Sequence, residues 1–383
     1  MRNKASDFRT LCVHAGELKD TQHGGAISPL FASTSYAFND VDIKQYPRYF
    51  NTPNQRGLCE KIAALEGAES ALIFGSGMAA ISTALLSHLK SGDHVIFQDD
   101  IYGGTRNFIK TEFEKYGIQY SFAKGLDASD FEAEITPQTK GIYVETPSNP
   151  TLKIIDLKAI SELAKSSSLW TMIDNTFASP VNQNPIAHGI DIVIHSATKY
   201  LGGHSDICAG VVVASESIIA QVFESAKNLG GSLSDYTVWL LERSIKTLYV
   251  RVQAQNENAH LLSNFLQEQD WIEHVYYPGL ENHVGHQIAK RQMHGFGGML
   301  SFNLAQGIDT KQFLLGLGLI KPTMSLAGIE STALSPRLTS HALLSESERQ
   351  AQGITEQLVR FSSGIEAIED LKSDLLQSIS KIR

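Results

Sequence analysis

A lysine that follows an apolar run is the residue of this sequence best suited to covalent chemistry. Lys199 lies in HSATKYLGGHSD, just beyond an apolar run, with Ser196 and Thr198 beside it. In a doubly wound sheet the carboxyl ends of the strands line the ligand crevice. A lysine held there loses hydration, so its pKa falls and its amine can attack an aldehyde. Taken alone, the same segment is also typical of a surface lysine in a polar loop.

Two further segments carry residues that suit the same ligand. One apolar run ends in Asp174, and FGSGMAA (74–80) turns through Gly75 and Gly77 into a helix whose first N–H groups can hold a phosphate. Taken alone, an acid at the end of a strand is most often a helix cap or a turn residue. The glycine turn is neither a Walker A loop nor a full GxGxxG motif. Together with Lys199, the phosphate site and an acid for a ring nitrogen describe a site for pyridoxal 5′-phosphate (PLP).

Short apolar runs alternate with amphipathic segments in the middle of the chain, and these elements must position the three sites. The runs typical of strands are HVIFQDD (94–100), GIYVET (141–146), WTMIDN (170–175), DIVIHSAT (191–198) and CAGVVVAS (208–215). The segments typical of helices are AAISTALLSHLK (79–90), RNFIKTEFEKYG (106–117) and LKAISELAKSSS (157–168). This alternation predicts βαβ units and an α/β fold whose mostly parallel sheet is covered by helices on both faces.

The chain divides into three parts by composition. Residues 1–50 are turn-rich, polar and aromatic, too irregular for a domain, so we expect an arm that lies against another surface. Residues 51–250 hold the alternating runs and all three ligand sites. Residues 251–383 begin with a long helical pattern, pass through the Gly-rich HGFGGMLSFNLAQG and return to helix. The pattern of residues 251–383 predicts a smaller C-terminal α+β domain.

The composition indicates a globular enzyme that acts on a small molecule. The 383 residues carry 32 Lys and Arg against 41 Asp and Glu, a net charge of −9, which disfavours nucleic acid and anionic membranes as partners. No stretch approaches 18 consecutive apolar residues and no apolar signal region stands at the N-terminus, so we expect neither a membrane span nor secretion. The three scattered cysteines predict no disulfide framework. The expected location is the cytoplasm.

Several histidines raise the question of a metal site. His283, His286 and His294 are the strongest candidates, but no acid or cysteine stands at ligand spacing, so we expect no bound metal. His204, which follows the lysine segment, is expected to hold its own loop by hydrogen bonds.

Eleven motifs occur in the order typical of one enzyme family. They are TLCVHAG (10–16), YPRYFN (46–51), SGMAA (76–80), DDIYGGT (99–105), ETPSNP (145–150), DNTF (174–177), SATKYLGGHSD (196–206), IKTL (245–248), KRQMHGFGGMLSF (290–302), MSLAGIES (324–331) and LVRFSSGIE (358–366). The chain resembles, over nearly its whole length, the Cys/Met-metabolism (trans-sulfuration) family of fold-type I PLP-dependent enzymes. That family contains cystathionine γ-synthase, cystathionine β- and γ-lyases, methionine γ-lyase and O-acylhomoserine sulfhydrylases. The resemblance implies a seven-stranded, mostly parallel sheet between helices and a smaller C-terminal α+β domain.

The resemblance also implies roles for the residues that would hold the cofactor. Lys199 would bond covalently to PLP and carry protons, Asp174 would keep the pyridine nitrogen protonated, and Tyr102 would stack on the ring. The phosphate would be held by the main-chain amides of Gly77 and Met78 and by the hydroxyls of Ser196 and Thr198.

Other residues would bind the substrate or a neighbouring subunit. By the same resemblance, Arg360 would clamp the substrate α-carboxylate through two parallel bonds, supported by Ser325 and Asn149. Tyr46 and Arg48 would reach the phosphate in the active site of the neighbouring subunit, where Tyr46 also borders the substrate. This implies an obligate dimer joined by the N-terminal arms, within a homotetramer that is a dimer of dimers.

Positions around the far end of the substrate distinguish the reactions of the family. Members that handle cystathionine at Cγ typically carry an acid, an arginine and a glutamate where this chain has Gln45, Asn107 and Met324. An apolar Met324 suits a thioether or a bulkier neutral group, and Arg106, one place before the expected arginine, would compensate in part. Methionine γ-lyases usually have Cys at the position of Gly104.

Two segments depart from the family pattern. The usual Asn-Pro-Thr reads Asn51-Thr52-Pro53, so we expect a different local turn in the arm. The usual His-Pro-Ala reads Ser335-Pro336-Arg337, which adds a positive charge to the C-terminal domain.

We therefore predict a PLP-dependent carbon–sulfur lyase of sulfur amino acids, of the cystathionine β- or γ-lyase or methionine γ-lyase type. The alternative is γ-replacement, by a cystathionine γ-synthase or an O-acylhomoserine sulfhydrylase. Two hypotheses from other classes are a catalytically idle PLP-binding protein and an aminotransferase on the same fold. Tyr46, Arg48 and the segment 196–206 favour the trans-sulfuration branch over the aminotransferases.

Overall fold

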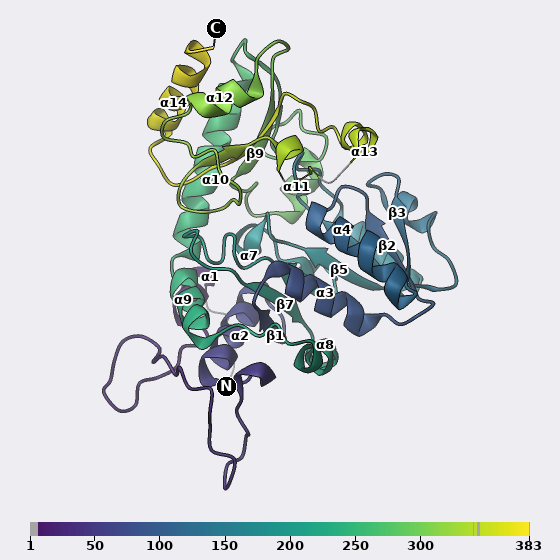
Figure 1. The fold of residues 1–383 in the computed structure, drawn as a ribbon, viewed down its shortest axis with the longest axis vertical. Coiled ribbons are helices and arrows are strands. Elements are labelled where there is room, and N and C mark those ends of the chain that lie inside the picture. The colour runs from purple at the N-terminus through teal and green to yellow at the C-terminus, as the bar shows by residue number, and fades with distance from the viewer. Residues whose placement is uncertain (1–6, 340, 343–344, 383) are drawn as a thin grey trace.

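Two β-sheets with their surrounding helices make up the protein (Figure 1). The structure is a computed structural model that describes residues 7–339, 341–342 and 345–382. In Figure 1 the larger sheet and its helices occupy the middle of the view, and the smaller sheet lies above them with the C-terminal helices. The N-terminal segment extends below the larger sheet.

The larger sheet has seven strands in the order β1-β7-β6-β5-β4-β2-β3. Neighbouring strands from β6 to β3 are parallel, whereas β7 is antiparallel to both β1 and β6. The strands are β1 (Ser70–Phe74), β2 (His94–Gln98), β3 (Gln119–Ala123), β4 (Thr139–Glu145), β5 (Trp170–Asp174), β6 (Ile192–His195) and β7 (Gly210–Ala214). The predicted α/β fold with a seven-stranded, mostly parallel sheet is confirmed.

Alternate residues of these strands enter two separate apolar layers, as the two-residue period of a strand requires. Ile73 and Val193 belong to the layer on one face, and Leu72 and Ile194 to the layer on the other. The first layer contains side chains of α2 (Pro53–Glu66), α5 (Ala128–Glu132), α6 (Leu157–Ser166) and α9 (Asp235–Ile245). The second contains side chains of α3 (Gly77–His88), α4 (Gly103–Glu112) and α8 (Glu216–Leu229). Short helical segments link these elements: η2 (Phe113–Tyr116), α7 (Ser179–Asn182) and η3 (Pro185–His188).

The smaller sheet is antiparallel throughout, in the order β10-β11-β9-β8. Its strands are β8 (Ile272–Tyr276), β9 (Met299–Leu304), β10 (Thr332–Leu334) and β11 (Leu358–Ser362). A third apolar cluster joins it to α12 (Thr310–Gly316) and α14 (Ile368–Ser380). The remaining elements of this region are α11 (His286–Gln292), η4 (Pro336–Leu338) and α13 (Glu346–Ala351). These elements form the smaller C-terminal α+β part that the sequence predicts.

One long helix connects the two parts. In α10 (Leu248–Gln267) the side chains of Leu248 and Val252 pack under the larger sheet, whereas those of Leu262 and Leu266 pack in the C-terminal cluster. The predicted division between residues 250 and 251 therefore falls at the start of a helix shared by both cores.

The first fifty residues contain α1 (Phe8–His14), η1 (Pro47–Tyr49) and long irregular segments between them (Figure 1). Eight large apolar or aromatic side chains are exposed there: Ile27, Leu30, Phe31, Phe38, Val41, Ile43, Tyr46 and Tyr49. Single exposed apolar residues are ordinary, but so many on one segment indicate a surface that meets another.

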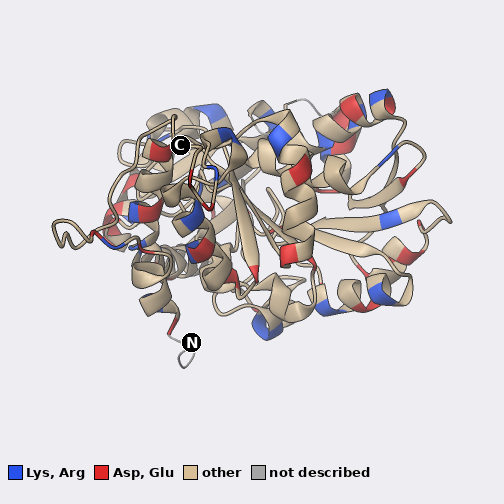
Figure 2. Cartoon of the chain, turned by 90° about the horizontal axis from the view of Figure 1, so that it is seen from below, with Lys and Arg blue, Asp and Glu red and all other residues tan. Residues whose placement is uncertain are grey.

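The surface of the molecule carries charges of both signs. Acidic and basic residues are interspersed on the helices around the larger sheet (Figure 2). Within the described ranges, none of the helices combines the length and apolarity that crossing a membrane requires. Cys12, Cys59 and Cys208 are all free thiols.

Candidate active site

The carboxyl ends of three adjacent parallel strands bring the predicted chemistry together. Glu145 ends β4 and lies opposite Asp174, which ends β5, and β6 leads directly to Ser196 and Lys199. Carboxyl ends of parallel strands meet at one edge of a sheet, so these residues lie side by side although the sequence separates them.

Lys199 has the properties of a nucleophilic amine. Its Nζ donates a hydrogen bond of 2.8 Å to the hydroxyl of Ser325. Burial and, to a smaller extent, repulsion by the nearby guanidinium of Arg360 together lower the pKa of Lys199 to about 8. A much larger share of this amine than of an ordinary lysine is therefore neutral near physiological pH, and the neutral form is the one that attacks an aldehyde.

Asp174 is a buried carboxylate held by one neighbour. Its Oδ1 accepts hydrogen bonds from the main chain of Thr176 at 3.0 Å and from the Thr176 hydroxyl at 2.5 Å. Burial raises the pKa of Asp174, while the Thr176 bonds, His195 and Lys199 oppose that rise. Neither Thr176 bond uses Oδ2, which can therefore face a protonated ring nitrogen.

Arg360 belongs to the smaller sheet and approaches Lys199 from the side away from the larger sheet's strand ends. The residue lies in β11 and is 5% exposed. Its Nη1 donates to Asn149 Oδ1 at 3.2 Å and its Nη2 to the main-chain oxygen of Ser325 at 3.0 Å. Burial lowers the pKa of Arg360 to about 10, so the guanidinium stays charged at neutral pH. No acidic side chain among the described residues pairs with this guanidinium, and a buried cation of this kind is suited to a substrate carboxylate.

The start of α3 has the geometry expected of a phosphate site. The side chain of Ser76 accepts the N–H of Ala79 at 3.1 Å, and the first helical N–H groups, those of Gly77 and Met78, have no partner within the helix. A Cβ added to Gly77 would lie 2.9 Å from the Cβ of Ser196, so only glycine permits this close approach. The Ser196 hydroxyl is thereby brought next to the two amides.

Thr198 differs in part from its predicted role. Its hydroxyl donates to the main-chain oxygen of Ala209 at 3.2 Å and accepts the Ala209 N–H at 3.0 Å. The side chain thus ties the lysine loop to the start of β7, and its hydroxyl would donate to a phosphate only after turning its hydrogen away from Ala209.

Tyr102 stands at the start of α4 with 41% of its surface exposed. Its main-chain N–H donates to Glu145 Oε2 at 2.7 Å. A Cβ added to Gly104 would lie 2.5 Å from the Tyr102 ring, so a side chain at position 104 would push that ring aside. Glycine there allows the ring position that this chain adopts.

Tyr46 and Arg48 lie apart from this cluster within one chain. Arg48 Nη1 donates to the main-chain oxygen of Lys227 at 2.6 Å and its guanidinium lies over the ring of Tyr49 at 5.1 Å. Tyr46 is 42% exposed and its N–H donates to Asn51 Oδ1. The arm therefore presents both residues outward at the end of α8.

Arg106 does not serve the far end of the substrate, which corrects one expectation. Its guanidinium donates to Asp99, lies 3.6 Å from a carboxylate oxygen of Glu348 and stacks over Phe122 at 4.0 Å. These contacts hold the guanidinium among the loop after β2, strand β3 and α13. Met324, at 72% exposed, is open to solvent in the single chain.

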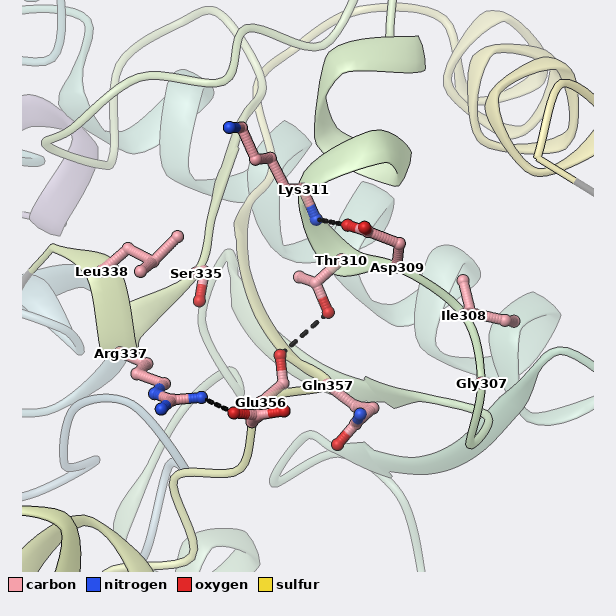
Figure 3. Close-up of a pocket in the computed structure, with 10 residues that line it drawn as sticks. All are labelled: Gly307, Ile308, Asp309, Thr310, Lys311, Ser335, Arg337, Leu338, Glu356 and Gln357. Atoms are coloured by element: carbon pink, nitrogen blue, oxygen red, sulfur yellow. Dashed lines mark hydrogen bonds and ion pairs between the residues drawn. The ribbon is translucent and has the colours of Figure 1, made fainter.

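Arg337, the unusual charge of the C-terminal part, lines a hollow of about 390 Å³ (Figure 3). It forms ion pairs with Glu356 and, at 3.6 Å, with Glu346. Figure 3 also shows Thr310 bonded to the main chain of Glu356. The lining contains none of the predicted site residues, and Arg337 serves to connect η4 with the segments before β11.

Two of the three candidate metal ligands are engaged in ordinary contacts. His286 bonds to the main-chain oxygen of Pro278, and His283 accepts the N–H of Gly285. In the described part of the chain no three His, Cys, Asp or Glu side chains are grouped to hold a metal ion. His204 bonds to the main chain of Gly202, as expected for a loop contact.

The site contains polar residues that the sequence reading did not single out. Glu145 is one, although its run ends in an acid just as the run of Asp174 does, so the same signal was available. Glu66 and His195 form a second group, 2.5 Å apart and each 1% exposed behind the lysine segment. Nothing in the sequence pairs residues 129 positions apart.

The residues present fit PLP. The neutral amine of Lys199 suits an aldehyde, the buried carboxylate of Asp174 suits a protonated ring nitrogen, and the Gly77 cradle suits a phosphate. The α/β fold and this site together define the class of PLP-dependent enzymes.

Comparison with known proteins gives the same answer. The family described as "Cys/Met metabolism PLP-dependent enzyme" matches residues 9–380, and the chain belongs to that family. It is 40% identical over 379 residues to a cystathionine beta-lyase of Lactococcus lactis, covering 98% of this chain and 100% of the relative. It is 39% identical to a cystathionine gamma-lyase of Bacillus subtilis, covering 98% and 99%. The crystal structure of cystathionine gamma-lyase from Lactobacillus plantarum complexed with L-serine superposes with a TM-score of 0.95 at 37% identity, covering 98% of this chain and 99% of the other.

These findings confirm the predicted family, the predicted fold and the predicted class of PLP-dependent carbon–sulfur lyases. The family acts on small amino-acid molecules and requires PLP.

Proposed function

We propose that this enzyme cleaves the carbon–sulfur bond of a cystathionine-like or methionine-like amino acid by β- or γ-elimination. The observation that carries the proposal is the position of Lys199, whose amine has a lowered pKa, donates to Ser325 and lies within electrostatic reach of both Asp174 and Arg360. The names of the relatives, cystathionine beta-lyase and cystathionine gamma-lyase, support carbon–sulfur cleavage.

Each residue has a defined task in this proposal. When bound, PLP supplies an aldehyde and a ring that accepts electron density from the bond broken at Cα. Lys199 would hold the aldehyde carbon of PLP, with loss of water, and once displaced by the substrate amine it would carry a proton at Nζ, oriented by Ser325. Asp174 would hold the ring nitrogen. Gly77, Met78, Ser196 and Thr198 would bind the phosphate.

The substrate is held from two sides. Arg360 and Asn149 receive the α-carboxylate, and a fork-shaped guanidinium fixes the Cα–H bond in direction as well as in place. Tyr102 stacks on the cofactor ring and, being exposed at its edge, can receive or supply the proton of the leaving group. The apolar Met324 borders the sulfur side of the substrate.

The quaternary proposal is a homotetramer built from two dimers. Residues 1–50 act as an arm that carries Tyr46 and Arg48 into the neighbouring subunit, residues 51–250 bind PLP, and residues 251–383 bear the carboxylate clamp. The exposed apolar side chains of the arm support this arrangement. The free thiols and the acidic charge support the cytoplasm as the location.

The test is product analysis of the purified, PLP-loaded enzyme with cystathionine, methionine, cysteine, and O-acetyl- or O-succinyl-homoserine plus cysteine. Pyruvate with homocysteine indicates a β-lyase, and 2-oxobutyrate with cysteine or methanethiol a γ-lyase. Cystathionine formed from an acylated homoserine would replace the proposal with γ-replacement. Accumulation of pyridoxamine 5′-phosphate would indicate an aminotransferase, and no product at all an idle PLP-binding protein.

A further inference from the structure

Glu145 is a buried carboxylate in the middle of the site to which the proposed reaction assigns no task. It is 4% exposed and ends β4 directly opposite Asp174. Burial and the neighbouring Asp174 raise its pKa above the usual value of a glutamate, whereas the main-chain N–H groups of Tyr102 and Asn149 oppose that rise and favour the ionised carboxylate. Placing two acids on adjacent strand ends costs stability, so Glu145 needs a compensating function at this site.

Both carboxylate oxygens of Glu145 hold the main chain of another site residue. Oε2 accepts the N–H of Tyr102 at 2.7 Å, and Oε1 accepts the N–H of Asn149 at 3.2 Å. The strand end itself is fixed by Gln98, whose side-chain oxygen accepts the N–H of Glu145 at 2.9 Å. One carboxylate thus joins the loop after β2 to the loop after β4.

The contacts continue to the substrate clamp. Asn149 Oδ1 accepts Arg360 Nη1 at 3.2 Å, so a chain of hydrogen bonds runs from Tyr102 through Glu145 and Asn149 to Arg360. We propose that Glu145 is a positioning residue that couples the tyrosine on the cofactor face to the guanidinium that receives the substrate carboxylate. This inference rests on the proposed function, because the roles of Tyr102 and Arg360 belong to it.

The chemistry of the two donors explains why this residue is a glutamate. Two main-chain N–H groups point at one side chain, so that side chain must present two acceptors. A glutamine has one acceptor, and its amide nitrogen would face the second N–H without forming a bond. An aspartate keeps both acceptors but is one methylene shorter, so it cannot span the same two donors.

Glu145→Gln and Glu145→Asp test the coupling, with Glu132→Gln on the exposed surface of α5 as the matched control. Each variant is examined for PLP affinity, for the circular dichroism of the bound cofactor, and for kcat and KM. Amino-acid binding is also titrated through the cofactor absorbance, which needs no turnover. We expect Glu145→Gln to weaken PLP and to raise KM together, each by about tenfold, as the loss of one charge-assisted bond implies.

A double variant separates positioning from simple destabilisation. In the Arg360→Ala background, Glu145→Gln should raise KM by less than about threefold, because residues acting through one another are not additive. Glu145→Asp, which retains the charge, should lie between wild type and Glu145→Gln. Unchanged PLP affinity and unchanged KM in both variants, with only a lower melting temperature, would overturn the inference.

Failure of the proposed function has a different signature. If the wild-type enzyme forms no product from any sulfur amino acid, the cofactor dichroism and the amino-acid titration still report whether Glu145 couples Tyr102 to Arg360. A Glu145→Gln variant that changes the dichroism but not the amino-acid affinity, or the reverse, would reject the coupling whatever the reaction is.

Discussion

At the scale of single residues, the position of Lys199 next to Arg360 controls a protonation. The pKa of Lys199 is lowered to about 8, so below that pH the amine is a cation and above it a nucleophile. The rate at which PLP combines with the apoenzyme should therefore rise with pH and level off above about 8, unlike that of an ordinary lysine. Rapid-mixing absorbance would measure it, with N-acetyl-lysine as the reference for the ionisations of PLP itself.

Three variants sharpen this prediction. Arg360→Ala removes the repelling charge and should move the midpoint to higher pH, whereas Arg360→Lys should leave it nearly in place. Lys199→Ala should lose covalent attachment of PLP and all turnover. A midpoint that stays the same in Arg360→Ala would show that the guanidinium does not act on the amine.

Arg360 also supports a prediction about substrate binding. Arg360→Ala removes a buried, two-pronged partner of the carboxylate, so KM should rise by about 100-fold, with a smaller fall in kcat. Arg360→Lys keeps the charge but loses the two-pronged geometry, so its KM should lie between those of the wild type and Arg360→Ala. Steady-state kinetics with the substrate identified by product analysis would measure it, and an unchanged KM would show that the clamp is assigned to the wrong residue.

At the scale of elements, the start of α3 depends on one glycine. A Cβ at Gly77 would meet the side chain of Ser196 at 2.9 Å, whereas a Cβ at Gly75 would meet nothing closer than 3.6 Å. Gly77→Ala should therefore cost about 1–3 kcal/mol of unfolding free energy and widen the phosphate cradle, lowering PLP affinity. Gly75→Ala, two residues earlier, is the control and should change neither.

Urea unfolding of the apoenzyme and a PLP titration would measure the two effects separately. Equal behaviour of Gly77→Ala and Gly75→Ala would mean that the contact with Ser196 does not shape the site.

At the scale of the whole molecule, the arm predicts a site shared between subunits. Lys199→Ala and Arg48→Ala subunits should each be nearly inactive, yet a mixed dimer contains one site with both native residues. An equal mixture should recover about a quarter of wild-type activity, since half of the dimers are mixed and each has one intact site of two. Activity after joint refolding would measure it.

The control for this experiment is a mixture of Lys199→Ala with Asp174→Asn. Both residues come from the same subunit, so every site in that mixture has a defect and no activity should return. Recovery in the control, or none in the test mixture, would contradict an arm that crosses between subunits.

The sequence by itself determined the fold class and the family and proposed most of the cofactor residues, because each of these rests on local patterns. Apolar runs ending in Asp174 or leading to Lys199 can be read from neighbours in the chain, and so can the turn before α3. The edge strand β3 escaped this reading because its residues are only partly buried, so its sequence QYSFA lacks a continuous apolar run.

Only the tertiary structure decided what depends on residues far apart in the chain. It directs Arg106 to Asp99 and Glu348, and it joins Glu66 to His195 and Glu145 to both Tyr102 and Asn149. The direction of a side chain on a helix and the meeting of strand ends follow from how whole elements pack. No pattern of neighbouring residues contains that information, because burial and long-range hydrogen bonds arise only once the sheets and helices are assembled.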